Sequence, residues 1–181
     1  DSKITRNLNV IAQNTKRLLE LTGQLLDFRK VGANKFKMDF AWVNVTTLLK
    51  DTILRFEPTI LQQDKELSVD IPEEEITAAI DQEAVTKILS NLLNNALKYS
   101  AHTIRIELRQ EETTFSIRVT SDGNRIPAEL SQQIFEPFYQ INKKEGASTG
   151  AGIGLPLARS LAMLHSGKLW LDTEVNGNSF V

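Results

Sequence analysis

Residues 82–99 read QEAVTKILSNLLNNALKY, and this stretch decides the fold of the chain. Apolar residues recur in it every three or four positions, which predicts an amphipathic helix with one face toward a core. The core-facing residues are Ile88, Leu89, Leu92, Leu93, Ala96 and Leu97. Asn91, Asn95 and Lys98 lie at i, i+4 and i+7, so they share a second, polar face of the same helix.

The asparagines on that polar face indicate a site. Asparagine in a helix interior is disfavoured against alanine by roughly 0.6 kcal/mol, and a plain solvated face would favour Glu, Lys or Gln. Side-chain amide oxygens are hard ligands that Mg²⁺ accepts while it keeps most of its waters and the oxygens of a bound polyphosphate. Lys98, one turn beyond Asn95, can meet such a phosphate as a point charge.

A second phosphate signal lies at residues 148–158, which read STGAGIGLPLA. Gly150, Gly152 and Gly154 lead into a predicted helix at 153–165, whose Pro156 is tolerated only in a first turn. Free N–H groups at a helix N-terminus attract phosphate, and absent side chains let it approach. The chain has no GxxxxGK[ST], and GAGIG is not a GxGxxG after a strand, so P-loop and Rossmann sites are excluded.

Strand and helix signals alternate around these two stretches. A hairpin is predicted at 104–119, with its turn near residues 111 and 112. The other predicted elements are a strand at Phe36, Met38 and Phe40, a helix at 45–63 capped by Asn44 and interrupted or kinked near Pro58, strands at 66–72 and 76–81, a short helix at 127–135, a loop at 139–149 and a strand within 168–175. This order predicts an α+β fold, a two-layer sandwich with a mixed, mostly antiparallel sheet and helices on one face.

The first 31 residues predict one long helix before this domain. Its seam residues are Ile4, Leu8, Ile11, Thr15, Leu18, Leu21, Leu25 and Phe28. Such a seam fits either a helix bundle or an amphipathic helix packed on its own domain. The helix should end near Gly32, so we divide the chain into a helix at 1–31, a hinge at 32–35 and a domain at 36–181.

Composition excludes several classes of protein. The 181 residues are 41% apolar and 24% charged, with a net charge of −2 and no cysteine. The charge argues against nucleic-acid binding, which requires clustered Lys and Arg. The absence of cysteine excludes disulfides and thiolate metal sites, and no apolar run reaches the roughly 20 residues of a membrane span.

Four short motifs in the chain resemble the conserved boxes of a known protein family. NLLNNALKY at 91–99, DG at 122–123 followed by IP, FEPF at 135–138 and GAGIGL at 150–155 resemble, in order, the N box, first glycine box, F box and second glycine box of sensor histidine kinases. The resemblance implies that residues 36–181 form an ATP-binding catalytic domain with the Bergerat fold of the GHKL class. It also implies a mobile lid between Phe138 and Gly150. The leading helix resembles the second helix of the dimerisation and phosphotransfer domain. The sequence LLDFRK at 25–30 is similar to the end of that helix in hybrid two-component sensors.

The resemblance also assigns roles to single residues. It implies that Asn95 ligates Mg²⁺, that Asn91 supports the metal and the phosphates, and that Lys98 contacts phosphate. Tyr99 would pack against the nucleotide, Gly152 and Gly154 would cradle the phosphates, and Gly150 would end a lid anchored by Phe135 and Phe138. Lys143 or Lys144 would reach the γ-phosphate. The implied ATP set is completed by Ser121, Asp122, Gly123, Ile126, Ile153 and Leu155.

The chain departs from the family pattern where adenine is read. The family has an aspartate before Asn-Gly, whereas VTSDGNRIP at 119–127 has Ser121 there and Asp122 one residue later. Neighbouring strand residues face opposite sides, so Asp122 does not replace the missing carboxylate unless the strand end bulges or turns early. Arg125 also replaces the second glycine. We therefore expect weakened adenine affinity.

The chain also lacks an HE[IL][RK]TP phosphoacceptor box, and we expect its two histidines, His102 and His165, to be structural. It begins where the family's second dimerisation helix would begin and ends within the expected final strand. We therefore expect a piece of a longer sensor, the cytoplasmic part of a membrane-anchored protein. That parent would transfer the γ-phosphoryl group of Mg-ATP to a histidine, for relay to a response-regulator receiver domain. The piece would bind nucleotide without autophosphorylation, and it could form a homodimer through residues 1–31.

Two alternatives remain open at this point. Ser121 and Arg125 are compatible with a degenerate nucleotide-binding or dimerisation module without kinase activity. A water-activating ATPase of the gyrase or heat-shock-chaperone type is the other alternative. Those relatives use a glutamate one turn before the metal-binding asparagine, and Asn91 at that position cannot act as a base.

Overall fold

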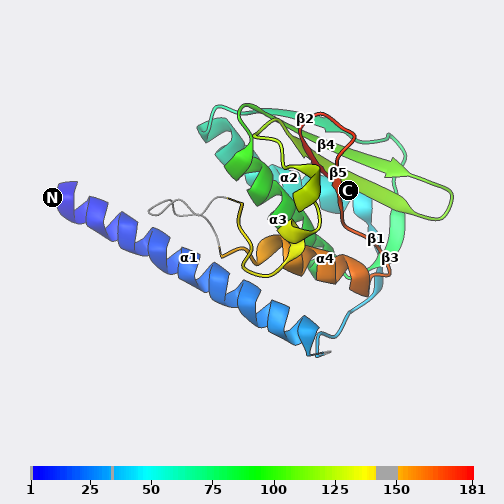
Figure 1. Ribbon diagram of the computed structural model, residues 1–181, viewed down its shortest axis with the longest axis horizontal. Helices are drawn as coiled ribbons and strands as arrows, with labels where there is room; N and C mark the ends of the chain where they lie inside the picture. The colour runs from blue at the N-terminus through cyan, green and yellow to red at the C-terminus, as the bar shows by residue number, and fades with distance from the viewer. Residues whose placement is uncertain (1, 34, 142–150) are drawn as a thin grey trace.

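The computed structural model describes residues 2–33, 35–141 and 151–181. Figure 1 shows a long helix, α1 (Ser2–Gly32), whose N-terminal half projects beyond a body of helices packed on a sheet. The predicted positions 143, 144 and 150 lie outside the described residues. Among the helices described, none combines the length and apolarity needed to cross a bilayer.

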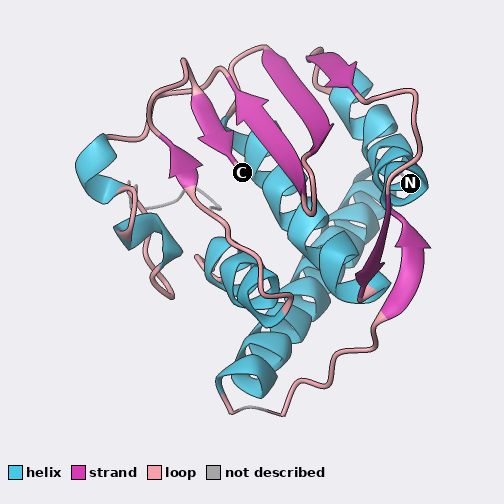
Figure 2. Cartoon of the chain, turned by 90° about the vertical axis from the view of Figure 1, so that its right-hand side faces the viewer, coloured by secondary structure: helices cyan, strands magenta, loops and turns pink. Residues whose placement is uncertain are grey.

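The main sheet has five strands in the order β2-β4-β5-β7-β6. These are β2 (Glu66–Asp70), β4 (Thr103–Gln110), β5 (Phe115–Ser121), β7 (Asn178–Phe180) and β6 (Leu171–Asp172). Only β2 and β4 pair in parallel, and the other neighbours are antiparallel. A separate antiparallel pair joins β1 (Ala41–Asn44) to β3 (Thr77–Ile80). Helices α2 (Val45–Gln62), α3 (Gln82–Tyr99) and α4 (Gly154–Leu164) cover one face of the sheet (Figure 2), which confirms the predicted two-layer α+β fold.

Alternation along the hairpin separates the two faces of this sheet. Ile106 and Leu108 are fully buried, and they pair across the ladder with Val119 and Ile117. The residues between them form ion pairs on the face that carries no helices. These pairs join Arg109 to Asp70, Arg105 to Glu107 and Arg118 to Asp172. A face of this kind is stable in water, so one layer of helices suffices.

Helix α3 lies at the centre of the core. On its apolar face Leu89, Leu92 and Leu93 are each 2% exposed, and the helix contacts α2, α4 and β5. Its bounds agree with the predicted ones, because a strong 3.6-residue period and an N-cap at Asp81 both act on the same segment.

Some predicted elements are wrong. The alternating residues Phe36 and Met38 form no strand, because they pack on a small cluster of Ala84, Leu157 and Leu161. Strand β1 begins only at Ala41. Helix α2 continues through Pro58, which lies on the exposed side, where a carbonyl without its donor can be solvated.

Two further predictions need correction near the C-terminal half. The short helix predicted at 127–135 is two separate 3₁₀ turns, Ala128–Leu130 and Gln133–Phe135. The strand predicted within 168–175 is limited to β6, because its partner β7 offers only a short ladder. Trp170 and Val181 extend this ladder by two backbone hydrogen bonds of 3.1 Å.

The leading helix behaves differently along its length. Near its C-terminal end Phe28 and Val31 pack on the cluster of Ala84, Leu157 and Leu161. Its earlier apolar residues are mostly exposed. Among them, Ile4, Leu8, Ile11 and Leu18 are 60–65% exposed. Packing on the domain is therefore observed at the C-terminal end of α1, whereas the exposed seam before it leaves the helix bundle a prediction.

Asp81 forms hydrogen bonds to three segments, which are the loop after α1, the first turn of α3 and the end of α4. Its carboxylate accepts hydrogen bonds from the N–H groups of Asp39 (2.8 Å) and Ala84 (2.9 Å). Its own N–H donates to Nε2 of His165 (3.1 Å), whose Nδ1 lies 2.8 Å from the Leu161 carbonyl oxygen. His165 thus has the expected structural role. Burial opposes the charge of Asp81, but the N–H donors of Asp39 and Ala84 outweigh it and hold its pKa below the usual range.

We predict that Asp81→Ala lowers the free energy of unfolding by about 2 kcal/mol, because it removes an N-cap and leaves a buried N–H without an acceptor. The folded-state pKa of Asp81 is below its unfolded-state pKa of about 3.9. The ionised carboxylate therefore stabilises the folded state fully above the unfolded-state pKa, and this stabilisation is lost as the pH falls through the folded-state pKa. Urea denaturation between pH 3 and pH 7 should therefore show that the variant unfolds with a lower free energy than wild type, and that this difference becomes smaller toward pH 3. Asp51→Ala, at an exposed position of α2, should change stability by no more than about 0.5 kcal/mol. A deficit independent of pH would contradict the prediction.

Candidate functional site

The polar face of α3 meets the N-terminus of α4 at Asn91 and Gly154. A Cβ placed on Gly154 would lie 2.8 Å from Oδ1 of Asn91. The Asn91 side chain is held at both ends, since Nδ2 donates to the Lys87 carbonyl (2.9 Å) and Oδ1 accepts from Nε2 of Gln24 (3.2 Å). Asn91 is only 8% exposed. The structure thus brings the asparagine helix and the glycine run into contact.

Asn95 and Lys98 continue this face toward solvent. Asn95 is half-buried, and its amide makes no hydrogen bond to any residue of the described segments. Lys98 is exposed, with its ammonium 4.6 Å from the centroid of the Tyr99 ring, which is itself half exposed. Exposure to solvent therefore increases along this helix face from Asn91 through Asn95 to Lys98. Among the described residues nothing occupies the Asn95 amide, so it is available for a ligand.

The N-terminus of α4 is also available. Its N-cap residue, Ile153, makes no side-chain cap hydrogen bond, and the first turn contains no acidic residue. Ile153 is buried and Leu155 packs partly on the core, so the backbone of this turn is held in place. Free N–H groups on a fixed helix end favour an anion.

Gly152 ties the second glycine box to the end of the F box. It has φ +71°, and a Cβ there would lie 2.8 Å from the Tyr139 carbonyl oxygen. The Phe138 N–H donates to the Gly152 carbonyl (2.9 Å), so both ends of the intervening segment meet. Phe135 is buried against Phe180, whereas the Phe138 ring is exposed and its backbone makes the contact.

The first glycine box lies over the C-terminal end of α3. A Cβ on Gly123 would lie 1.7 Å from the Tyr99 carbonyl oxygen, so only glycine fits. Asp122 accepts hydrogen bonds from the N–H groups of Ala101 (2.9 Å) and His102 (3.0 Å). Burial opposes its charge, but these donors and that of Thr103 hold the pKa of Asp122 below its usual range. Its carboxylate is therefore already engaged by the turn between α3 and β4.

Ser121 is the last residue of β5 and points toward the core beside Ile104, its partner in the ladder. It is 5% exposed, and within the described chain its hydroxyl makes no hydrogen bond. No described side-chain oxygen or nitrogen is both buried and without a hydrogen-bond partner, so the Ser121 oxygen lies where a ligand or a water can reach it. Asp122 and Ser121 face opposite ways, as alternation predicts.

The sequence did not single out Asn178, which holds the loop after Gly123. It is paired with Ser121 across the ladder and is 4% exposed. Its Nδ2 donates to the Asn124 carbonyl (2.9 Å), and its Oδ1 accepts from the N–H of Ile126 (2.8 Å). No motif in the sequence marked this clamp, because it depends on strand pairing between distant segments.

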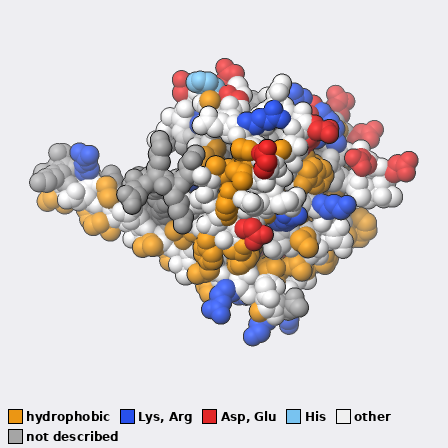
Figure 3. All heavy atoms as spheres, viewed as in Figure 1, with side chains coloured by type: hydrophobic (Ala, Val, Ile, Leu, Met, Phe, Trp, Pro, Cys, Tyr) orange, Lys and Arg blue, Asp and Glu red, His pale blue; other side chains and the backbone are white. Residues whose placement is uncertain are grey.

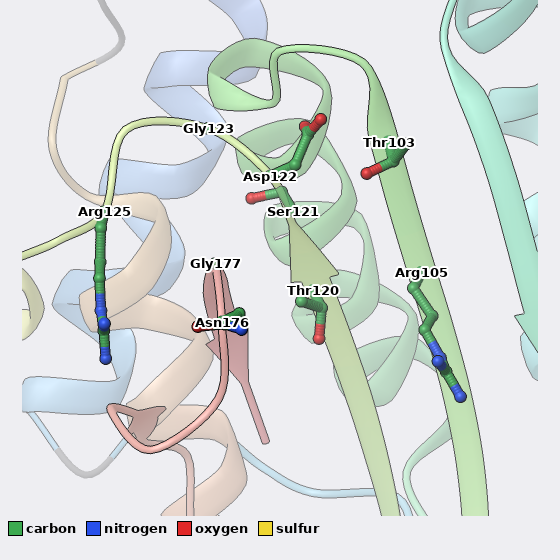
Figure 4. Close-up of a pocket in the computed structure, with 9 residues that line it drawn as sticks. All are labelled: Thr103, Arg105, Thr120, Ser121, Asp122, Gly123, Arg125, Asn176 and Gly177. Carbon is green, nitrogen blue, oxygen red and sulfur yellow. The ribbon is translucent and has the colours of Figure 1, made fainter.

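A cavity of about 350 Å³ opens beside this loop on the helix-free side of the sheet (Figure 4). It is lined by Thr103, Arg105, Thr120, Ser121, Asp122, Gly123, Arg125, Asn176 and Gly177. Arg105 and Thr120 belong to the charged face, so this cavity is separate from the face of α3 that carries Asn91 and Asn95. Among the described residues there is also no cluster of three or more His, Cys, Asp or Glu side chains able to hold a metal ion.

Comparison with known proteins gives the family of the chain. Residues 80–181 match the family described as histidine kinase-, DNA gyrase B- and HSP90-like ATPases. The chain belongs to this family. The ATPase-family domain contains α3, both glycine boxes and the strands that carry them.

Relatives and solved structures extend the similarity beyond that domain. The chain is 30% identical over 173 residues to the sensor histidine kinase WalK of Bacillus subtilis, covering 93% of this chain but 28% of WalK. The chain thus spans less than a third of that relative. The solved catalytic domain of the histidine kinase ThkA is 26% identical, with a TM-score of 0.70 over 79% of this chain and 95% of that domain. Full-length ShkA in complex with AMPPNP shares the fold at 21% identity and a TM-score of 0.82, over 97% of this chain and 37% of ShkA.

The close approach at Gly123 gives a testable result. Gly123→Ala should lower the free energy of unfolding by at least about 2 kcal/mol, because its Cβ would overlap a backbone carbonyl that cannot move independently of α3. Gly23→Ala is the matched control. Apart from its chain neighbours and the nearby backbone of α1, no described atom lies within 4 Å of its added Cβ, and the change should stabilise α1 by up to about 1 kcal/mol. Chemical denaturation should show a lower free energy of unfolding for Gly123→Ala and an equal or higher one for Gly23→Ala. Equal changes in the two variants would contradict the close approach of Gly123 to α3.

Proposed function

We propose that this chain is the nucleotide-binding catalytic part of a sensor histidine kinase. It binds ATP with Mg²⁺ between α3 and the N-terminus of α4 and presents the γ-phosphoryl group to a histidine of the longer protein, for relay to a response-regulator receiver domain. The proposal places this domain on the cytoplasmic side of a membrane-anchored sensor. The observation that carries it is the contact of Gly154 with the Asn91 amide, beside the amide of Asn95, which makes no hydrogen bond to a residue that the structure describes.

The residues present fit Mg-ATP. The Asn95 amide makes no hydrogen bond within the described segments, and its oxygen is of the type that Mg²⁺ accepts. The uncapped N-terminus of α4 offers N–H groups to phosphate oxygens, and Gly152 and Gly154 leave room for them. Lys98 places a cation at the open end of the same face. Lys143 and Lys144 are proposed as further phosphate contacts on the family pattern alone.

The chemistry follows from these groups. Bound ATP supplies the phosphoryl group, and the accompanying Mg²⁺ neutralises part of its charge. Asn91 and the start of α4 orient the phosphates, and Lys98 adds charge neutralisation, so the contribution of the chain is positioning and electrostatics. An amide cannot remove a proton from water, so Asn91 favours transfer to an acceptor residue over a gyrase-type hydrolysis.

Adenine would be read at the other end of α3. The Ser121 hydroxyl, which makes no hydrogen bond to any residue of 2–33, 35–141 or 151–181, can donate or accept one there, and Asn178 holds the adjoining loop in place. A neutral hydroxyl makes a weaker bond to the adenine amino group than a carboxylate does. Weakened adenine affinity therefore stays our prediction.

Calorimetric titration of Mg²⁺ and AMPPNP tests the proposal. Wild type should bind saturably, and Asn95→Ala should lose at least about 10-fold in affinity, because a metal ligand is removed. Asn94→Ala is the matched control, since Asn94 is the neighbouring exposed asparagine of α3, and it should bind like wild type. If wild type shows no binding at millimolar nucleotide, the proposal fails and the degenerate module is the better interpretation.

We also propose that the open seam of α1 pairs with a second copy of this chain. Figure 3 shows hydrophobic side chains spaced along α1, and Leu8 and Leu18 are 60% and 65% exposed. Repeated apolar residues on one helix face favour a bundle, because burial removes them from water.

Light scattering should show a mass that rises from monomer to dimer with concentration. The double variant Leu8→Lys and Leu18→Lys should remain monomeric, because it places charge on the seam. Leu61→Lys, at a leucine of α2 that is 76% exposed, should dimerise like wild type. A wild-type chain that is monomeric at every concentration would exclude this pairing.

A further inference from the structure

The leading helix touches the proposed phosphate end of the nucleotide site through two polar contacts. Nε2 of Gln24 donates to Oδ1 of Asn91 at 3.2 Å, and Asp27 forms an ion pair with Lys87 at 2.8 Å. Gln24 and Asp27 are about one helical turn apart on α1, and Lys87 and Asn91 are one turn apart on α3. Two facing turns are therefore joined at two points, and this fixes the register of one helix against the other.

The ion pair is more than a loose surface contact. The side chains of Asp27 and Lys87 are 18% and 29% exposed, and Lys87 also pairs with Glu83 at 2.8 Å and lies over the Phe36 ring. Burial opposes the charge of Lys87, but both carboxylates outweigh it and raise the pKa of Lys87. Partly buried and doubly paired, this lysine holds α1 more firmly than an isolated exposed pair would.

The same lysine residue takes part in orienting Asn91. Its backbone carbonyl accepts from Nδ2 of Asn91, so this bond and the one from Gln24 define which way the amide faces. With both bonds made, Oδ1 is the atom nearest to the start of α4, where a Cβ on Gly154 would lie 2.8 Å away. Partners behind a metal-binding or phosphate-binding group set its orientation, and their loss typically lowers metal affinity by about 10- to 100-fold.

We propose that Gln24 is a positioning residue of the nucleotide site, which holds the Asn91 amide with its oxygen toward the N-terminus of α4. This inference rests on the proposed function, in which Asn91 supports the metal and the phosphates. It also makes the site sensitive to α1. A shift of α1 along its axis withdraws Gln24 from Asn91 and disturbs the Mg²⁺-dependent part of nucleotide binding while the adenine end stays unchanged.

The test compares ADP affinity in excess Mg²⁺ with ADP affinity in EDTA, since a purely structural role would lower both. Gln24→Glu keeps the size of the side chain but removes the donor, and Gln24→Ala removes the amide. Both variants should reduce the gain in affinity on adding Mg²⁺ by about 10-fold and leave the affinity in EDTA unchanged. Gln62→Ala, at an exposed glutamine of α2, is the control and should match wild type.

A double-mutant cycle identifies the route of the effect. Gln24→Ala should have no further effect in an Asn91→Ala background, because its action passes through that amide. A Mg²⁺-dependent gain that is unchanged in both Gln24 variants would overturn the inference, as would equal losses with and without Mg²⁺. The proposed function is tested separately by Asn95→Ala, so a chain that loses binding there but not in the Gln24 variants would retain its function without this role for Gln24.

Discussion

Burial of one face of α3 is the constraint on which the rest of the structure depends. The helix lies between the sheet and its neighbouring helices, and its apolar face is almost completely removed from water. Burying a side chain such as leucine contributes roughly 1.5–3 kcal/mol, so the rotation of α3 about its axis is firmly set. That rotation leaves Asn91 at the margin of the core and directs Asn95 and Lys98 away from it.

Glycines then allow two other segments to approach the same helix. Gly123 lies against the last carbonyl of α3, and Gly154 lies against the Asn91 side chain about two turns earlier. Any side chain at either position would push its loop away. The proposed nucleotide site is therefore built from one rigid helix and two close backbone approaches, and its adenine and phosphate ends lie at different heights along α3.

The leading helix joins this arrangement at the phosphate end. Its last turns are held by apolar packing of Phe28 and Val31 and by the polar pair of Gln24 and Asp27, whereas its first turns have an open apolar seam. Under the proposals made above, the first turns of α1 pair with a partner helix, and its last turns orient Asn91 at the nucleotide site. A single helix would then join the dimer surface to that site.

The sequence by itself determined the bounds of α3, the alternation of the hairpin and the polar face with its three residues, because these depend on local periodicity that burial reinforces. It also carried four motifs whose order indicated the family. It did not determine that Phe36 and Met38 pack under α1, since an alternating apolar run is compatible with a strand until a neighbouring helix supplies another way to bury it. Two contacts join residues that are far apart in the chain. Asn178 holds the Asn124 carbonyl 54 positions away, and Gln24 donates to Asn91 67 positions away. Only the tertiary structure decided them, because a hydrogen bond between distant segments leaves no period in the chain.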